Sequence, residues 1–167
     1  MNLRIIGIDP GTAITGWSIL EIINDKIKTI AYGHITTFLQ DDTAERLKEL
    51  SNDLIKIIQK YKPVEAAIED IFYFKNAKTI IKVSQARGAI LLTLENLGIS
   101  IAEYTPLQVK QAISGYGRAE KKQVQLMVKN ILNLSKIPQP DDTADALAIA
   151  ICHWQSRKMK LIEKLNN

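Results

Sequence analysis

The first 37 residues contain three strand-like segments separated by very short connections, and this spacing constrains the fold more than any other feature. Arg4–Asp9 is a short apolar run stopped by Pro10-Gly11, and Thr15–Ile22 carries β-branched and aromatic residues. Lys28–Thr37 follows the turn residues Asn24-Asp25. Short connections join antiparallel strands, whereas parallel strands need a long crossover. The sequence therefore predicts a three-stranded antiparallel meander at the start of the chain.

Helices and strands alternate in the rest of the chain. The predicted order is a helix that Asp41 or Asp42 caps and Pro63 ends, a strand over Val64–Glu69, a helix over about Lys78–Leu97, a strand over Ile99–Tyr104, a short helix from Thr105-Pro106, a helix over Lys121–Leu134, and a last helix over Ala144 to about Leu161 that the chain enters from Asp142. This order predicts the α/β class, with a mixed five-stranded sheet flanked by helices. The 167 residues suit one domain (1–167), with a core of about residues 3–154 and a helical tail to residue 167.

The charge and cysteine content limit the possible partners. Lys and Arg number 22 against 18 Asp and Glu, which gives a net charge of +4. This modest basic excess permits nucleic-acid binding without requiring it, and it argues against a polycationic partner. The single cysteine, Cys152, excludes an internal disulfide and a zinc site built from several thiolates, and it suits a reducing cytoplasm. No apolar run approaches the length of a membrane helix, so no membrane association is expected.

Four acidic residues stand where the predicted elements would carry chemistry. Asp9 ends the first strand and Glu69 ends the fourth. Asp142 and Asp145 lie three residues apart in the last helix and would share one of its faces. Phosphodiester hydrolysis needs an activated water and a stabilised leaving oxygen, which two divalent ions about 3.5–4 Å apart can supply. Carboxylates from different elements would suit Mg²⁺, and no serine or cysteine nucleophile motif competes with them.

Structural interpretations of the first two acids remain open on the sequence alone. Asp9 could simply form a turn before Pro10-Gly11. Alternatively, Gly7 and Gly11 could leave space beside Asp9 so that a ligand approaches closely. Glu69 could be a solvated acid in a loop.

The acids of the last helix have a strong structural alternative as well. Asp141 or Asp142 could cap the free N–H groups of the helix and suit its dipole. Asp145 is harder to explain in this way because the surrounding run, Ala144–Ile149, is otherwise apolar. A carboxylate there would be costly to bury unless it were paired or bound to a metal. By contrast, His34 and His153 are interpreted as structural.

Four segments, in order, resemble the motifs of the RuvC-type Holliday-junction resolvases. They are Gly7–Thr12 with Thr15-Gly16-Trp17; Ile68-Glu69 through Phe72 and Lys75-Asn76-Ala77 to Gln85–Gly88; Gln108–Gln111 with Gly115-Tyr116-Gly117 and Ala119-Glu120-Lys121; and Pro138-Gln139-Pro140 with Asp142 and Ala144–Ala150. The first motif alone is weak, but four in order at this length are specific. The resemblance covers roughly Leu3 to Trp154.

This resemblance implies a ribonuclease H-like fold, a homodimer and a crossover junction endodeoxyribonuclease activity in DNA recombination and repair. It implies Mg²⁺-dependent, paired nicking of two opposed strands of a four-way junction, with two ions per site and Mn²⁺ as a substitute. The metal-binding acids of the family fall on Asp9, Glu69, Asp142 and Asp145, which selects Asp142 over Asp141. The implied protein partner is the RuvA and RuvB branch-migration complex.

The resemblance also places DNA-contacting residues. The junction-contacting aromatic of the family falls on Phe72, and Tyr73 or Phe74 could share its role. The important lysines of the family fall on Lys110 and Lys121.

The residues themselves support this interpretation in part. Lys75 and Arg87 follow the aromatics, and basic side chains beside an exposed aromatic suit phosphate contact and base stacking. Lys121 opens a predicted helix, where its charge opposes the dipole, and this favours a role in binding phosphate. The alternatives are that Phe72 belongs to the core and that the lysine-rich helix faces are only solvated.

Three rival functions remain open at this point. An ATP-binding protein of the actin, sugar-kinase and Hsp70 group shares an Asp-x-Gly on the first strand but needs two such domains. A RuvC-like ribonuclease that matures RNA would share the acids without the aromatic and lysine features. A non-catalytic junction-binding module would not need acids at all four positions.

Overall fold

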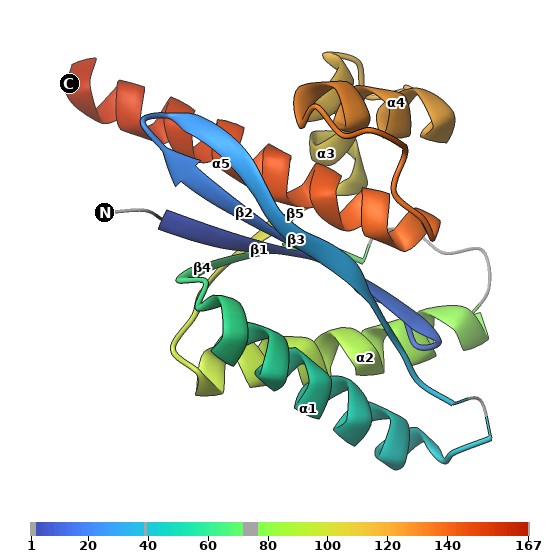
Figure 1. Ribbon diagram of the computed structural model, residues 1–167. Helices are drawn as coiled ribbons and strands as arrows, with labels where there is room; N and C mark the ends of the chain where they lie inside the picture. Colours follow the sequence, from blue (N-terminus) through green and yellow to red (C-terminus); the bar gives the residue numbers. More distant parts are fainter. Residues whose placement is uncertain (1–2, 39, 72–76, 167) are drawn as a thin grey trace.

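The sheet has five strands in the order β3-β2-β1-β4-β5 (Figure 1). The computed structural model describes residues 3–38, 40–71 and 77–166. Strands β1 (Leu3–Asp9), β2 (Ile14–Ile23) and β3 (Lys26–Thr36) are antiparallel neighbours. Strands β4 (Glu65–Glu69) and β5 (Ser100–Tyr104) run parallel to β1. The predicted meander and the predicted mixed five-stranded sheet are therefore confirmed.

The helices cover both faces of this sheet (Figure 1). One face carries α1 (Thr43–Tyr61) and α2 (Ala77–Asn96), and the other carries α5 (Asp141–Asn166), with α3 (Pro106–Ser114) and α4 (Lys121–Ile131) beside it. Within the described ranges, no helix is both long and apolar enough to cross a membrane.

The ends of the first and third helices follow the predicted capping. The carboxylate of Asp42 accepts a hydrogen bond from the backbone N–H of Glu45 at 2.8 Å, so Asp42 rather than Asp41 caps α1. Thr105 and Gln108 form a reciprocal capping box at the start of α3. The last helix differs from the prediction, because it begins at Asp141 and extends beyond Leu161 to Asn166. Asp141 and Asp142 therefore lie within the first turn of α5 instead of preceding the helix.

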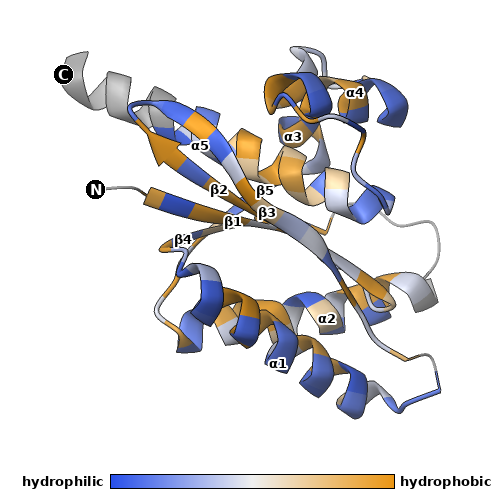
Figure 2. Ribbon diagram, in the orientation of Figure 1, coloured by the Kyte–Doolittle hydropathy of each residue, from blue (hydrophilic) through white to orange (hydrophobic). Residues whose placement is uncertain are grey.

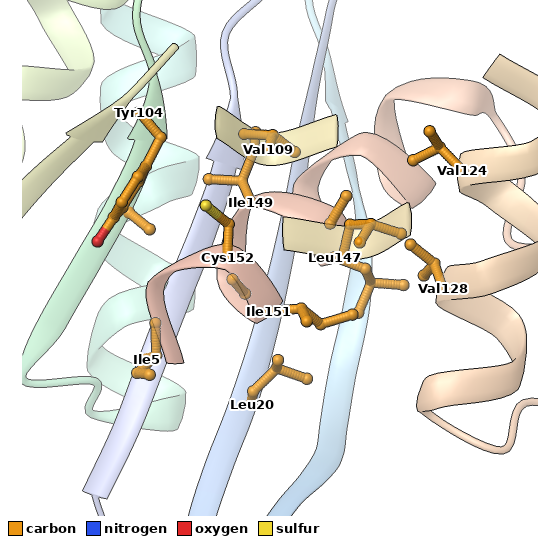
Figure 3. Packing of buried hydrophobic residues seen from close by; sticks show 14 of the residues in the cluster. Ile5, Leu20, Tyr104, Val109, Val124, Val128, Leu147, Ile149, Ile151 and Cys152 are labelled. Atoms are coloured by element: carbon orange, nitrogen blue, oxygen red, sulfur yellow. The ribbon is translucent and has the colours of Figure 1, made fainter. Parts of the chain in front are cut away.

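Strand alternation divides the interior into two hydrophobic clusters. Ile5 and Leu20 pack with Leu147 and Ile151 of α5 (Figure 3), whereas Ile6 packs with residues of α1 and α2. The inward sides of α1 and α2 are correspondingly hydrophobic and their outward sides polar (Figure 2). The sheet is thus buried on both faces, which fixes the register of its central strands.

The backbone of α5 packs directly against two glycines of the sheet, Gly7 and Gly16. A Cβ at Gly7 would collide with the carbonyl oxygen of Ala146, and a Cβ at Gly16 would collide with that of Asp142. The buried hydroxyl of Ser18 donates a hydrogen bond to the Ala146 carbonyl at 2.9 Å. The prediction that Gly7 leaves space for a ligand is therefore wrong, because the backbone of α5 fills that space.

The expectation for Gly11 is also wrong. A Cβ there would collide with the carbonyl oxygen of Ile14, so this glycine allows the turn between β1 and β2 to close on itself. The hydroxyl of Thr15 donates to the Gly11 carbonyl at 2.7 Å and completes the turn. Both glycines serve the packing of the chain.

We expect Gly16→Ala to lower the free energy of unfolding by about 1–3 kcal/mol or more, because the new methyl group would displace the first turn of α5. Gly88→Ala is the matched control: Gly88 is exposed on α2, with no atom within 4 Å of a Cβ there. That control should raise stability by about 0.5–1 kcal/mol through helix propensity. Denaturant unfolding measures both, and equal stability of the two variants would contradict the close contact of α5.

Candidate active site

Asp9 and Glu69 lie side by side at the ends of adjacent parallel strands. The register pairs Gly7 of β1 with Ala67 of β4, and each acid follows two residues later as the last residue of its strand. Side chains two residues apart in a strand point to the same face. Gly7 and Ala67 face α5, so both carboxylates project toward α5 as well.

Helix α5 brings two further acids to the same place. Gly16 is the antiparallel partner of Asp9, and the backbone of Asp142 rests directly on this glycine. Asp145 follows one turn later on the same face of the helix and lines a pocket together with Glu69. Three separate elements, β1, β4 and α5, therefore bring together the four acids predicted from the sequence.

Burial and neighbouring charges raise the pKa values of three of these acids, Asp9, Glu69 and Asp145. Burial raises the pKa of Asp9 well above its ordinary value, and the negative charges of Asp145, Glu69 and Asp142 raise it further. Burial, followed by the charge of Asp145, raises the pKa of Glu69 to about 7. Burial also raises the pKa of Asp145, although Lys121 opposes this shift. The site therefore strongly favours additional positive charge, as protons or as bound cations.

One cation of the chain already lies among these acids. The Nζ of Lys121 is 3.1 Å from Asp145 Oδ2 and 3.3 Å from Asp141 Oδ2. The buried side-chain amide of Gln125 donates to Asp141 Oδ1 at 2.9 Å, and this bond, followed by the bond from Lys121, lowers the pKa of Asp141. Asp141 is thus turned toward α4, while Asp142 contributes its charge to the set around Asp9.

A pocket of about 250 Å³ opens beside the acids. Its lining consists of Glu69, Pro106, Val109, Lys110, Lys121, Val124, Asp145 and Ala148. The charges of Lys110 and Lys121 both lower the pKa of Glu69, in opposition to its burial. The pocket therefore presents two lysines and two carboxylates over an apolar floor. A larger pocket of about 310 Å³, near Thr12 and Lys82, includes none of the four acids.

The acids do not form a preformed metal cage. Among residues 3–38, 40–71 and 77–166, no three Asp, Glu, His or Cys side chains converge closely enough to hold an ion. Two features of the site explain this spacing: the carboxylates repel one another, and Lys121 holds Asp145 at 3.1 Å. The donor set is nevertheless all-oxygen and partly desolvated, which is the chemistry that hard divalent cations such as Mg²⁺ require.

The predicted DNA-contacting residues are only partly described. Phe72 and Lys75 lie outside the described residues. Lys110 and Lys121 line the pocket next to Glu69. Arg87 instead turns inward to the end of β4, where its Nε donates to the Glu69 carbonyl at 3.2 Å.

Sequence reasoning missed several polar residues around this site. Asp70 and Glu103 both contact Arg87, and Gln125 holds Asp141. No local motif marks these residues, because each pairs with a partner at least sixteen positions away in the sequence. The one sequence signal was a polar residue, Gln125, among the apolar residues that form the inward side of α4. The structure shows that this side chain is buried.

Both histidines were predicted to be structural, and His153 has the contacts of a structural residue. This residue is buried between β4, β5 and α5, and its ring nitrogens lie 2.8 Å from the Tyr104 hydroxyl and 2.9 Å from Glu65 Oε2. His34 lies in β3 opposite Gly16.

The comparisons with known proteins agree with this geometry. A family model described as "Crossover junction endodeoxyribonuclease RuvC" matches residues 5–153. The crossover junction endodeoxyribonuclease RuvC of Caldanaerobacter subterraneus subsp. tengcongensis is 54% identical over 157 residues, covering 94% of this chain and 95% of that protein. The protein of the same name from Syntrophomonas wolfei is 52% identical, covering 94% of this chain and 91% of that protein.

Solved structures show the same fold. Thermus thermophilus RuvC in complex with a Holliday junction substrate has a TM-score of 0.89 and 32% identity, covering 95% of this chain and 96% of that chain. The yeast mitochondrial Holliday junction resolvase Ydc2, at 16% identity and a TM-score of 0.66, shares the fold alone. The predicted ribonuclease H-like fold is thereby confirmed. The match over residues 5–153 and the identities above 50% place the chain in the RuvC family of crossover junction endodeoxyribonucleases.

Proposed function

We propose that this chain resolves Holliday junctions by metal-dependent, paired nicking of two opposed DNA strands during recombination and repair. The observation that carries this proposal is the meeting of four carboxylates from β1, β4 and α5, three of which have raised pKa values. Membership of the RuvC family and the similarity to Thermus thermophilus RuvC bound to a Holliday junction support the choice of DNA substrate. The rival ATP-binding and non-catalytic functions receive no comparable support.

Asp9, Glu69, Asp142 and Asp145 would hold the metal, which we take to be Mg²⁺, two ions per site, with Mn²⁺ as a substitute. Bound there, the ions would supply an activated water and stabilise the leaving oxygen. The protein contributes the burial that raises the pKa values of Asp9, Glu69 and Asp145, together with neighbouring negative charges that would favour a bound cation. Asp141 is proposed to remain outside this set, because Gln125 and Lys121 already hold both of its oxygens.

Lys110 and Lys121 are proposed to bind the scissile phosphate. Both line the pocket that contains Glu69 and Asp145, and Lys121 is about half exposed. A divalent ion on Asp145 would compete with Lys121 for that carboxylate, so Lys121 would be free to turn toward a phosphate. The ammonium group of Lys121 would then lie next to the phosphate, where negative charge would increase during cleavage.

The remaining features of the proposal concern surfaces and assembly. We propose that Phe72 and Lys75 contact the junction, that the chain acts as a homodimer on four-way DNA, and that it works with the RuvA and RuvB complex. The proposed unit is one domain over residues 1–167, acting in the cytoplasm, which suits the buried thiol of Cys152.

Asp9→Asn should abolish Mg²⁺-dependent cleavage of a synthetic four-way junction, with a loss of at least roughly 10³-fold, because it removes a charged ligand from the centre of the acid set. Junction binding in EDTA should stay within about twofold of wild type. Asp53→Asn is the control, since Asp53 lies on α1 in an ion pair with Lys56. Linear duplex and an RNA–DNA hybrid serve as competing substrates, and efficient cleavage by Asp9→Asn would refute the proposed metal site.

The pKa of Glu69 predicts a pH-dependent stability. Folding raises this pKa from 4.5 to about 7, so between these pH values the folded chain keeps a proton that the unfolded chain has lost. The free energy of unfolding should therefore fall as pH rises from about 4.5 to about 7. Without metal, Glu69→Gln should be more stable than wild type at pH 8 by roughly 1–2 kcal/mol and similar to it at pH 5.

Added Mg²⁺ should reverse this order at pH 8, because the ion stabilises the ionised carboxylates of the wild type and cannot gain the same from an amide. Thermal unfolding with and without Mg²⁺ measures both effects. Glu95→Gln, exposed on α2, is the control and should keep the wild-type response to the ion. Equal Mg²⁺ responses of wild type and Glu69→Gln would count against a metal at this carboxylate.

Lys121→Ala should lower the rate of junction cleavage at least tenfold, by roughly the loss expected for one preorganised charged donor. Lys122→Ala is the matched control, because Lys122 is the next residue of the same helix and is exposed. Single-turnover cleavage with saturating protein compares them. If both substitutions reduced the rate equally, the basic character of α4 rather than the position of Lys121 would explain the effect.

A further inference from the structure

We infer that Arg87 is a positioning residue that fixes the end of β4, and with it Glu69, and is not a DNA contact. This inference rests on the proposed function in taking Glu69 as a metal-binding acid. Arg87 lies on α2, on the face of the sheet opposite α5, and its guanidinium reaches the exits of β4 and β5. Arg87 therefore approaches Glu69 from the face of the sheet opposite the acids of α5.

The guanidinium contacts one backbone carbonyl and two carboxylates at the exits of β4 and β5. Its Nε donates to the backbone carbonyl of Glu69 at 3.2 Å. Its Nη2 lies 3.2 Å from Asp70 Oδ1 and also contacts the carboxylate of Glu103. The side chain of Arg87 is only 14% exposed. A planar fork that joins a carbonyl to two carboxylates holds its partners in a geometry that a single ammonium group cannot reproduce.

Further hydrogen bonds make this strand exit rigid. The backbone N–H of Asp70 donates to the Tyr104 carbonyl at 2.8 Å, which continues the pairing of β4 with β5 beyond Glu69. The backbone N–H of Ile71 donates to Asp70 Oδ1 at 2.8 Å, the same oxygen that contacts Arg87. The peptide that follows Glu69 is therefore held on both sides, and the direction of the Glu69 side chain is set with it.

The local charge argues against a phosphate at Arg87. Two carboxylates, those of Asp70 and Glu103, are about half exposed and share the guanidinium of Arg87, so this group of three described residues carries a net negative charge. A phosphate would have to displace at least one of them and approach the other. Lys110 and Lys121, by contrast, lie in the pocket on the α5 side, where a phosphate could reach them.

Arg4 provides a matched control at the opposite end of the sheet. Its Nε donates to Glu21 Oε1 at 2.9 Å, and its Nη1 donates to the Tyr61 carbonyl at 2.8 Å. Arg4 thus also joins a carboxylate to a backbone carbonyl, but it stands near the start of β1, five residues before Asp9. Replacing either arginine should lower the stability of the fold, because each joins a carboxylate to a backbone carbonyl. Only replacement of Arg87 should change the behaviour of Glu69.

The experiment compares Arg87→Lys, Arg87→Ala and Arg4→Lys with wild type in the full-length chain. Junction binding is measured in EDTA at several salt concentrations, and cleavage of the bound junction is measured under single-turnover conditions. Mg²⁺ is also titrated without DNA, with the shift in melting temperature as the readout. Arg87→Lys retains the charge, which keeps the test valid if Arg87→Ala folds poorly.

We expect Arg87→Lys to lower the cleavage rate roughly 10–100-fold, the usual effect of losing a residue that orients a metal ligand, and to require several-fold more Mg²⁺ for half of the thermal shift. Junction affinity should stay within about twofold of wild type. Loss of one phosphate contact lowers the slope of log affinity against log salt concentration by roughly 0.9. We expect the slope for Arg87→Lys to change by less than half of that amount. Arg4→Lys should lower the melting temperature while leaving the cleavage rate and the Mg²⁺ titration unchanged.

Two results would overturn the inference. One is a salt slope reduced by about 0.9 in Arg87→Ala together with wild-type cleavage by Arg87→Lys, which would identify a phosphate contact. The other is a Mg²⁺ titration of Arg87→Lys that matches that of Arg4→Lys. If wild type failed to cleave the junction, the proposed function would fail, and the Mg²⁺ titration would still decide the role of Arg87.

Discussion

The close contact between α5 and the β1–β2 hairpin is the constraint on which the rest of the site depends. Gly7 and Gly16 allow the carbonyls of Ala146 and Asp142 to rest on the strands, and the Ser18 hydroxyl binds the same Ala146 carbonyl. Larger side chains at these two positions would keep the helix further from the sheet, because even a Cβ there would collide with the α5 backbone. Its carboxylates would then be unable to share an environment with those at the strand ends, so the packing that buries the core also assembles the acids.

Bringing these carboxylates together works against the stability of the fold. Burial and mutual repulsion raise the pKa values of Asp9, Glu69 and Asp145, which means that their ionised forms destabilise the folded chain. Lys121 offsets part of this repulsion, and Asp141 and Gln125 hold Lys121 in place. Under the proposed function, a divalent cation would gain binding energy at the acid set, because it would relieve repulsion that the chain itself does not remove.

Much of the fold follows from local pattern, whereas the contacts that complete the site do not. The short connections around Asn24-Asp25 predicted the meander, and the positions of Asp9 and Glu69 at the ends of apolar strands placed both acids correctly. The role of Gly7 could not be predicted, because a glycine that leaves space for a ligand and a glycine that leaves space for a helix backbone give the same sequence pattern. The contacts of Arg87 could not be predicted, because Glu103 is brought close to it only by the pairing of β4 with β5.

Asp145 shows why neither sequence nor packing alone explains the site. Its flanking residues, Ala144 and Ala146, are fully buried, and small side chains there let α5 approach the sheet. Within such a stripe, an alanine at position 145 would pack equally well, and it would avoid the desolvation of a carboxylate. The carboxylate is therefore unfavourable for folding at a position where the helix faces Glu69 across the same pocket. With one lysine beside it and two acids opposite, such an acid gives helix stability no benefit, and the proposed binding of a metal would account for its presence.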